Sequence, residues 1–249
     1  MYQMDPFVNG FPGKSASHGA FGWSSVHLLC GHGRTILVET GPPAYIPLLT
    51  AALERHGLTT DDVTDILLTH SHWDHLSNIM MFPKAQVWIG AEELTWARSL
   101  PQDAPFMSSL HVAELHGRGS AVSRIGGGDE ILPGITVVAS PGHTPGHLCY
   151  AVDTDTGPVL FAGDAVKNLY ELTTSNVDST LDAQASRATI TRLRNHMQDT
   201  GALLVPGHDV PLRLRGDTAI RIIEQRAQIS FFPTATGGEE DRTISDGSG

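Results

Sequence analysis

Short apolar runs recur along most of the chain, and Gly, Pro or polar residues end most of them. Runs of this length, closed by turn residues, are typical of β-strands. Residues 24–31 and 34–41 predict two strands that are joined by a turn at residues 31–33. Further strands are predicted at residues 65–69, 85–90, 135–140, 148–153, 158–163 and 202–208.

Segments with helical spacing of apolar residues lie between these runs. Residues 44–57 have such spacing and end at Gly57, a residue type that favours helix ends. In residues 179–197 one face combines Leu181, Ala185, Ala188, Leu193 and Met197, and Ser179 with Asp182 can form the start. Helices are also predicted at residues 75–83, at 91–99 and, with a basic character, near 217–229; residues 100–125 show no sustained period.

The predicted elements fall into two halves, each with strands first and strand–helix units afterwards. This order predicts an α/β fold in which two sheets pack face to face with helices outside, a four-layer αββα sandwich. A single open, doubly wound sheet explains the paired early strands less well. We expect one domain over residues 1–232, followed by a polar and disordered tail at residues 233–249.

Charge and composition limit the classes of molecule that this chain can bind. The formal net charge of -11 and the scattered basic residues argue against nucleic acid and fit a small-molecule substrate. No apolar run approaches the ~18 residues of a membrane span, and the first residues do not resemble a signal peptide, so we expect a cytoplasmic monomer or homodimer. Cys30 and Cys149 lie in apolar stretches and are interpreted as free thiols.

Candidate metal ligands follow directly after four of the predicted strands. They are His70, His72, Asp74 and His75 after residues 65–69, His143 after 135–140, Asp164 after 158–163, and His208 after 202–207. Loops at one end of the strands build the site in α/β proteins, so these side chains can converge. Imidazoles and carboxylates without a nearby thiolate suit zinc, with iron, manganese or cobalt as alternatives. Five histidines and two aspartates are the right number for two ions that share a carboxylate and a water.

The spacing within the first group has a geometric meaning. In an extended segment His70 and His72 project to the same side and can bind one ion. Asp74 and His75 lie where the chain turns into a helix, so they can face a second ion. We interpret the other histidines outside these segments as ordinary residues; they are His18, His27, His32, His56, His111, His116 and His196.

The segments THSHWDH, SPGHTPGH, FAGDA and VPGHD together resemble those of the metallo-β-lactamase superfamily, over about residues 24–208. The resemblance implies the αββα sandwich, a site at one edge of the sheets and two Zn²⁺ per chain. It implies a first ion on His70, His72 and His143, a second ion on Asp74, His75 and His208, and Asp164 between them. His147 is expected to orient a ligand. The family's DTG is Glu39-Thr40-Gly41 here, a departure at a contact behind the metals.

The resemblance also implies a reaction. Two cations that share a water produce hydroxide at neutral pH, which attacks an acyl carbonyl, and Asp74 is the best-placed proton shuttle. The complete H-x-H-x-D-H set is similar to that of quorum-quenching lactonases, so we expect hydrolysis of a lactone or carboxylic ester. These lactonases place a Tyr three residues after the bridging Asp, where this chain has Lys167, with Tyr170 three residues further. Lys167 is a candidate oxyanion donor or carboxylate-binding group, and Tyr170 is a second candidate.

Several alternatives stay open at this point. The same fold supports thioesterases, amide or β-lactam hydrolases and, in a different class, a mononuclear iron persulfide dioxygenase that tolerates loss of His75 and His208. A two-metal nuclease, a redox diiron protein and a non-catalytic metal-binding relative fit the sequence less well. Selectivity is expected from irregular segments, and the candidates for an apolar pocket are Phe21, Trp23, Trp73, Trp96, Phe106 and Met107.

Overall fold

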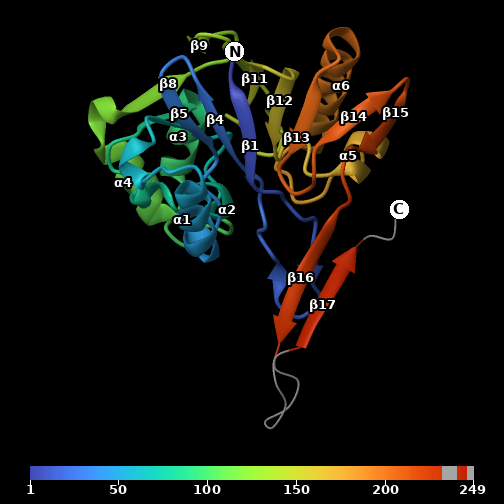
Figure 1. Ribbon diagram of the computed structural model, residues 1–249, viewed down its shortest axis with the longest axis horizontal. Helices are drawn as coiled ribbons and strands as arrows, with labels where there is room; N and C mark the ends of the chain where they lie inside the picture. Colours follow the sequence, from blue (N-terminus) through green and yellow to red (C-terminus); the bar gives the residue numbers. More distant parts are fainter. Residues whose placement is uncertain (232–239, 246–249) are drawn as a thin grey trace.

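The computed structural model describes residues 1–231 and 240–245 of the chain. Two large sheets lie at its centre, and helices cover their outer faces (Figure 1). This arrangement confirms the predicted four-layer αββα sandwich. Within the described ranges, no helix combines the length and the apolar character that crossing a membrane requires. Both cysteines are free, as predicted.

The first sheet has the strand order β1-β4-β5-β6-β7-β8. Strands β1, β4 and β5 pair antiparallel, whereas the pairs from β5 to β8 are parallel. The predicted strands near residues 24–31, 34–41, 65–69 and 85–90 are confirmed as β4 to β7. The strands are β1 (Gln3–Val8), β4 (Val26–Gly31), β5 (Arg34–Val38), β6 (Asp65–Leu67), β7 (Gln86–Gly90) and β8 (Val122–Ile125).

The second sheet has the order β15-β14-β13-β12-β11-β10-β9. Strand β11 runs antiparallel to both β10 and β12, and β12 is parallel to β13, so β10, β12 and β13 all point the same way. Their carboxyl ends therefore meet at one edge. The strands are β9 (Glu130–Leu132), β10 (Ile135–Ala139), β11 (Leu148–Thr154), β12 (Gly157–Gly163), β13 (Leu203–Pro206), β14 (Leu212–Arg215) and β15 (Thr218–Arg221).

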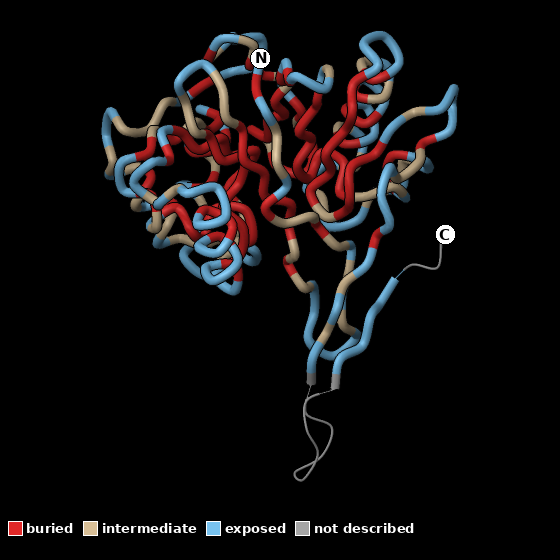
Figure 2. The backbone as a smooth tube through the Cα atoms, viewed as in Figure 1, coloured by how far each residue is buried: buried red, intermediate tan, exposed pale blue. Residues whose placement is uncertain are grey.

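Alternation along the strands builds separate core layers. On β5, Leu37 packs toward the outer helices, while Ile36 and Val38 pack between the two sheets. On β12, Phe161 faces the space between the sheets and Leu160 faces the helices on the far side. Buried residues fill these layers, as the red segments of Figure 2 show. The helices are α1 (Ile46–Arg55), α2 (Trp73–Leu76), α3 (Ala91–Ser99), α4 (Ser109–Gly117), α5 (Leu169–Thr174) and α6 (Ala183–Thr200), with 3-10 turns at Pro43–Tyr45, Thr60–Asp62, Ile79–Met81 and Gly119–Ala121.

Helix α6 begins as predicted but buries a different face. The Asp182 carboxylate caps it by accepting from the backbone N–H groups of Gln184 and Ala185. Leu193 and Met197 are buried as expected, whereas Leu181 lies before the helix and is exposed. Ser186 and Thr189 are buried in place of Ala185 and Ala188 because their hydroxyls bond to Thr180 and to the carbonyl of Pro141. Polar contacts with Thr180 and Pro141 therefore set the buried face.

The prediction of a helix near residues 217–229 is wrong, because this segment forms strands β15 and β16 (Arg226–Phe231). Gly216 adopts a positive φ of 57° and turns the chain between β14 and β15, which pair in register. The buried Asp209 carboxylate accepts from Nε and the terminal guanidinium nitrogen of Arg221, both at 2.9 Å, and holds β15 in place. A glycine turn and a tertiary ion pair thus override the helical spacing of this segment.

Two further pairs of strands lie outside the large sheets. Strands β2 (Lys14–Ser15) and β3 (Gly19–Ala20) form a short hairpin, and β16 (Arg226–Phe231) pairs with β17 (Glu240–Ser245). The β16–β17 hairpin projects away from the sandwich in Figures 1 and 2. Part of the tail predicted to be disordered is therefore strand β17, and residues 232–239 and 246–249 lie outside the described residues.

Candidate metal centre

The seven predicted ligands come from four strand ends that meet at one edge of the sandwich. The carboxyl ends of β10, β12 and β13 lead to His143, Asp164 and His208 respectively. The end of β6 in the other sheet leads to residues 70–75. Two hydrogen bonds hold the sheets together at this edge: the N–H of Leu148 donates to the carbonyl of Thr69 (2.9 Å), and the hydroxyl of Tyr150 donates to the carbonyl of Leu68 (2.7 Å).

The segment after β6 changes from extended to helical within a few residues. His72 has extended dihedral angles (φ -70°, ψ 152°) and stands immediately before helix α2. Asp74 and His75 lie in this short helix, so they face a different direction from His70 and His72. The carbonyl of His75 accepts from both the N–H and the hydroxyl of Thr40, at 2.8 and 3.0 Å, which anchors the helix to the end of β5.

Donor atoms of the seven side chains form three overlapping groups, within each of which the atoms lie no more than 4.8 Å apart. Nε2 of His143 is 2.9 Å from Nδ1 of His72. Asp164 stands between the outer groups, because its Oδ2 is 3.3 Å from Nε2 of His143 and its Oδ1 is 3.2 Å from Nε2 of His208. The groups are His70, His72 and His143; His70, His75 and Asp164; and Asp74, His75 and His208.

The residues at this centre fit divalent metal ions. Nε2 of His70 is buried and has no hydrogen-bond partner among the described residues. Nε2 of His75 and Oδ1 of Asp164 are also buried and lie 3.4 Å apart, and this Oδ1 is 3.2 Å from Nε2 of His208. Buried polar atoms without a partner are costly, so they indicate a group that binds them. Imidazole nitrogens and carboxylate oxygens are the ligands that zinc, iron, manganese and cobalt accept.

The charge states of the two outer groups differ. Burial, with the neighbouring histidines, holds the pKa of His70 well below its usual value, and burial lowers the pKa of His72 to about 4. Burial opposes protonation of His75 too, but Asp74, Asp164 and Glu39 together raise its pKa well above the usual value. The all-histidine group therefore presents neutral imidazoles, whereas metal binding at the mixed group must displace protons.

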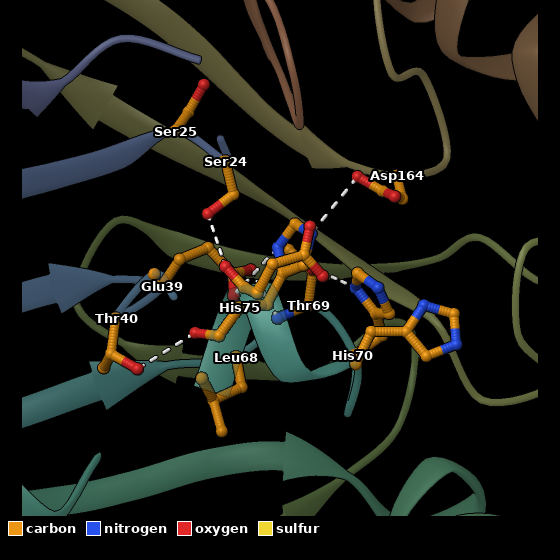
Figure 3. Close-up of polar contacts among 12 residues, drawn as sticks. Ser24, Ser25, Glu39, Thr40, Leu68, Thr69, His70, His75 and Asp164 are labelled. Atoms are coloured by element: carbon orange, nitrogen blue, oxygen red, sulfur yellow. Dashed lines mark hydrogen bonds and ion pairs between the residues drawn. The ribbon is translucent and has the colours of Figure 1, made fainter. Parts of the chain in front are cut away.

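Outer contacts hold several of these side chains in place. Glu39 follows β5, and its Oε1 accepts from the N–H of Thr69 (2.8 Å) while its Oε2 lies 3.4 Å from Nδ1 of His75 (Figure 3). Glu39, which is one methylene longer than the Asp of the family's DTG, therefore still contacts His75 from outside the centre. His147 stacks on His70 with ring centroids 5.0 Å apart, and its Nδ1 is 2.8 Å from the hydroxyl of Ser140.

Comparison with known proteins agrees with this geometry. The family model described as Metallo-beta-lactamase superfamily matches residues 21–208, which include all seven predicted ligands. The chain belongs to the metallo-β-lactamase superfamily. It is 34% identical over 115 residues to a hydroxyacylglutathione hydrolase of Saccharophagus degradans, which covers 46% of this chain and 37% of that protein. An N-acyl homoserine lactonase of a Bacillus species is 24% identical over 159 residues, or 64% of this chain and 60% of that protein.

Solved structures share this fold. An N-acyl homoserine lactone hydrolase with its product N-hexanoyl-L-homoserine at the catalytic metal centre superposes with a TM-score of 0.65. Identity is 20%, and the match covers 83% of this chain and 92% of that one, so the likeness shows the fold alone. The match spans only 37% of the length of the Saccharophagus hydrolase and 44% of the length of two probable metallo-hydrolases of Mycobacterium.

A cavity of about 220 Å³ opens beside the centre of this metallo-β-lactamase-fold chain. Of the predicted apolar candidates, Trp73 and Phe106 line it, whereas Trp23, Trp96 and Met107 pack against the core under the first sheet. Phe21 contacts Trp23 instead, with ring centroids 4.5 Å apart and the rings tilted by 33°. Sequence reasoning did not name several further lining residues, and the Gly- and Pro-rich composition of residues 9–13 is the signal that points to two of them. These lining residues are Phe11, Pro12, Asn168, Asp178 and Ser179.

The two predicted substrate-contacting residues differ in their placement. Lys167 is buried and lines the cavity. Its Nζ lies 2.7 Å from Oε1 of Glu171 and donates to the carbonyl of Asp178 at 3.0 Å. Tyr170 is 60% exposed on α5, where its hydroxyl accepts from Asn176, and it does not line the cavity.

Proposed function

We propose that this chain is a dinuclear metal hydrolase that opens a lactone or cleaves a carboxylic ester of a small molecule. The observation that supports this most is the set of overlapping donor groups beside a cavity lined partly by aromatic side chains. Zinc suits these donors best, with iron, manganese or cobalt as alternatives. In this proposal His70, His72 and His143 would hold one ion and Asp74, His75 and His208 would hold the other, with Asp164 placed between the two groups.

A pair of divalent cations supplies an ionised water at neutral pH and polarises an acyl carbonyl. The chain's own contribution begins with Asp74, which lines the cavity and lies with its Oδ2 3.4 Å from Nε2 of His208. From this place Asp74 can take a proton from the attacking water and give it to the leaving group. Trp73 and Phe106 exclude water from one wall of the cavity and accept an apolar part of the substrate.

Lys167 is proposed as the donor that orients the substrate. An ammonium group has three N–H donors, and the contacts with Glu171 and the Asp178 carbonyl occupy two of them. One donor is left for a carbonyl or leaving oxygen in the cavity. Because Glu171 neutralises the positive charge, Lys167 is suited to an uncharged oxygen rather than to a substrate carboxylate. Tyr170 is less suited, since it is exposed away from the cavity.

A thioesterase is the second candidate because one relative is a hydroxyacylglutathione hydrolase. An acylglutathione carries free carboxylates, and the cavity offers Lys14 and Lys167 as cations. Lys14 lies 3.7 Å from Asp178, and Lys167 pairs with Glu171, so both cations already have acidic partners. This charge balance favours an uncharged lactone or ester. A persulfide dioxygenase with one iron is disfavoured, since it does not need His75 and His208 in the cluster.

The experiment is a hydrolysis screen over lactones, aryl esters, thioesters and β-lactams, with metal content measured on the same sample. We expect turnover of lactones or esters that depends on zinc and exceeds turnover of glutathione thioesters. Persulfide oxidation without cleavage of any ester or lactone would overturn the proposal. Preference for thioesters would support the second candidate instead.

A further inference from the structure

Glu93 joins two segments that carry predicted ligands. It lies in the first turn of α3 and is 0% exposed. Its Oε1 accepts from the N–H of Ser71 at 2.9 Å and from the Ser71 hydroxyl at 2.6 Å. Its Oε2 accepts from the hydroxyl of Thr144 at 2.6 Å, and the N–H of Gly146 donates to the same carboxylate. One side chain therefore ties the segment after β6 to the segment after β10.

The four contacts saturate the Glu93 carboxylate. An ionised carboxylate accepts about four hydrogen bonds and donates none. All four partners are donors, and two of them are backbone N–H groups that cannot reverse their role. A buried carboxylate is stable only when it is bonded in this way. The arrangement therefore requires an acceptor with two oxygens at this position.

Backbone packing at Gly146 provides an independent observation on the same junction. A Cβ atom added to Gly146 would lie 2.0 Å from the backbone nitrogen of Glu93 and 2.5 Å from its Cα. A Cβ added to Gly90 would lie 2.5 Å from the carbonyl oxygen of Gly146. The segment after β10 therefore rests directly on the start of α3, with no room for a side chain between them.

We propose that Glu93 is the positioning residue of the first metal group, His70, His72 and His143. Ser71 lies between His70 and His72, and Thr144 follows His143, so the Glu93 carboxylate holds the backbone on both sides of this group. Glu39 makes the corresponding contact on the other side, beside His75. The inference rests on the dinuclear centre of the proposed function and assigns one buried glutamate to each ion.

The test is Zn²⁺ affinity, measured by chelator competition on metal-free protein. Glu93→Gln keeps the shape of the side chain but turns an NH₂ group toward donors. In a His208→Ala background, which leaves the first group intact, Glu93→Gln should weaken Zn²⁺ binding by about 10- to 100-fold. In a His72→Ala background the same change should alter the affinity by less than about threefold. The Co²⁺ absorption spectrum should change in the first background and not in the second.

Asp65→Asn is the matched control. Asp65 is also 0% exposed, and its carboxylate accepts from Arg34 and Trp88 at the opposite end of β6. Asp65→Asn should lower thermal stability without changing the Zn²⁺ affinity in the His208→Ala background or in the His72→Ala background. Thr144→Val removes a single donor, so it tests the same contact if Glu93→Gln fails to fold, and it should weaken the first site roughly threefold.

Equal affinity losses in both backgrounds, no loss in either, or the same loss with Asp65→Asn would overturn the assignment of Glu93. These results leave the dinuclear centre intact, because wild-type protein would still bind two Zn²⁺. Wild-type protein that binds no Zn²⁺ would instead overturn the proposed function, and the inference with it. The test needs no substrate, so an unidentified reaction does not affect it.

Discussion

A single added methyl group at Gly207 should disturb the predicted bridging carboxylate. A Cβ built on Gly207 would lie 2.0 Å from Oδ1 of Asp164 and 2.9 Å from the carbonyl carbon of Gly163. Ordinary contacts begin near 3.4 Å, so the carboxylate oxygen has to move by roughly 1.4 Å. The Gly207 segment cannot easily retreat, because its N–H donates to the carbonyls of Gly163 (2.9 Å) and Val166 (3.2 Å).

Misplacement of a reacting group by about 1 Å costs about 100-fold in rate, so Gly207→Ala should lower kcat/KM by about that factor. It should also lower the zinc content per chain. The backbone of Gly207 is not left-handed, so alanine adds only the methyl group. Gly117→Ala is the control, since its Cβ meets nothing within 4 Å. Steady-state kinetics with elemental analysis measures both effects, and wild-type values of both for Gly207→Ala would refute the reasoning.

Three further predictions concern Asp74, Lys167 and His27. Asp74→Asn should lower kcat by about 100-fold or more while zinc stays bound, because an amide cannot carry the proton; unchanged kcat would remove Asp74 from that role. Lys167→Met should lower kcat/KM about tenfold with unchanged zinc content, because one hydrogen bond to the substrate is lost. Full activity of this variant would argue against a substrate-binding role of Lys167. Burial lowers the pKa of His27 to about 4, so the unfolded chain binds the proton first and stability falls as pH drops below about 6.5. Between pH 7 and 5 metal-free wild-type protein should lose about 2 kcal/mol more unfolding free energy than His27→Leu in urea titrations, and parallel losses would contradict this.

The convergence of the candidate ligands could be predicted because each of them follows the end of an apolar strand. The run at residues 65–69 and the later runs mark β6, β10, β12 and β13, and the direction of those strands then brings His143, Asp164 and His208 to the same edge. The position of a ligand after a strand is a local property, so sequence alone carries it. The sandwich follows from the same pattern of buried strands and amphipathic helices.

Contacts between distant segments could not be predicted in this way. Glu92 and Glu93 are adjacent acidic residues at the start of a helix, yet Glu92 is exposed and Glu93 is fully buried. Only the docking of residues 143–147 on α3 separates their roles. The buried face of α6 depends likewise on Ser186 and Thr189, whose hydroxyls bond outside the helix. Such partners lie 48 or more residues away or in irregular loops, so the spacing of apolar residues along the sequence does not predict them.

The number of metal ions per chain tests the central claim most directly. Purified protein, saturated with Zn²⁺ and then dialysed, should contain close to two zinc atoms per chain by elemental analysis. The claim is that His70, His72 and His143 form one site, that Asp74, His75 and His208 form the other, and that Asp164 serves both. A ratio of one or less that supplementation with zinc, iron, manganese or cobalt cannot raise would contradict it.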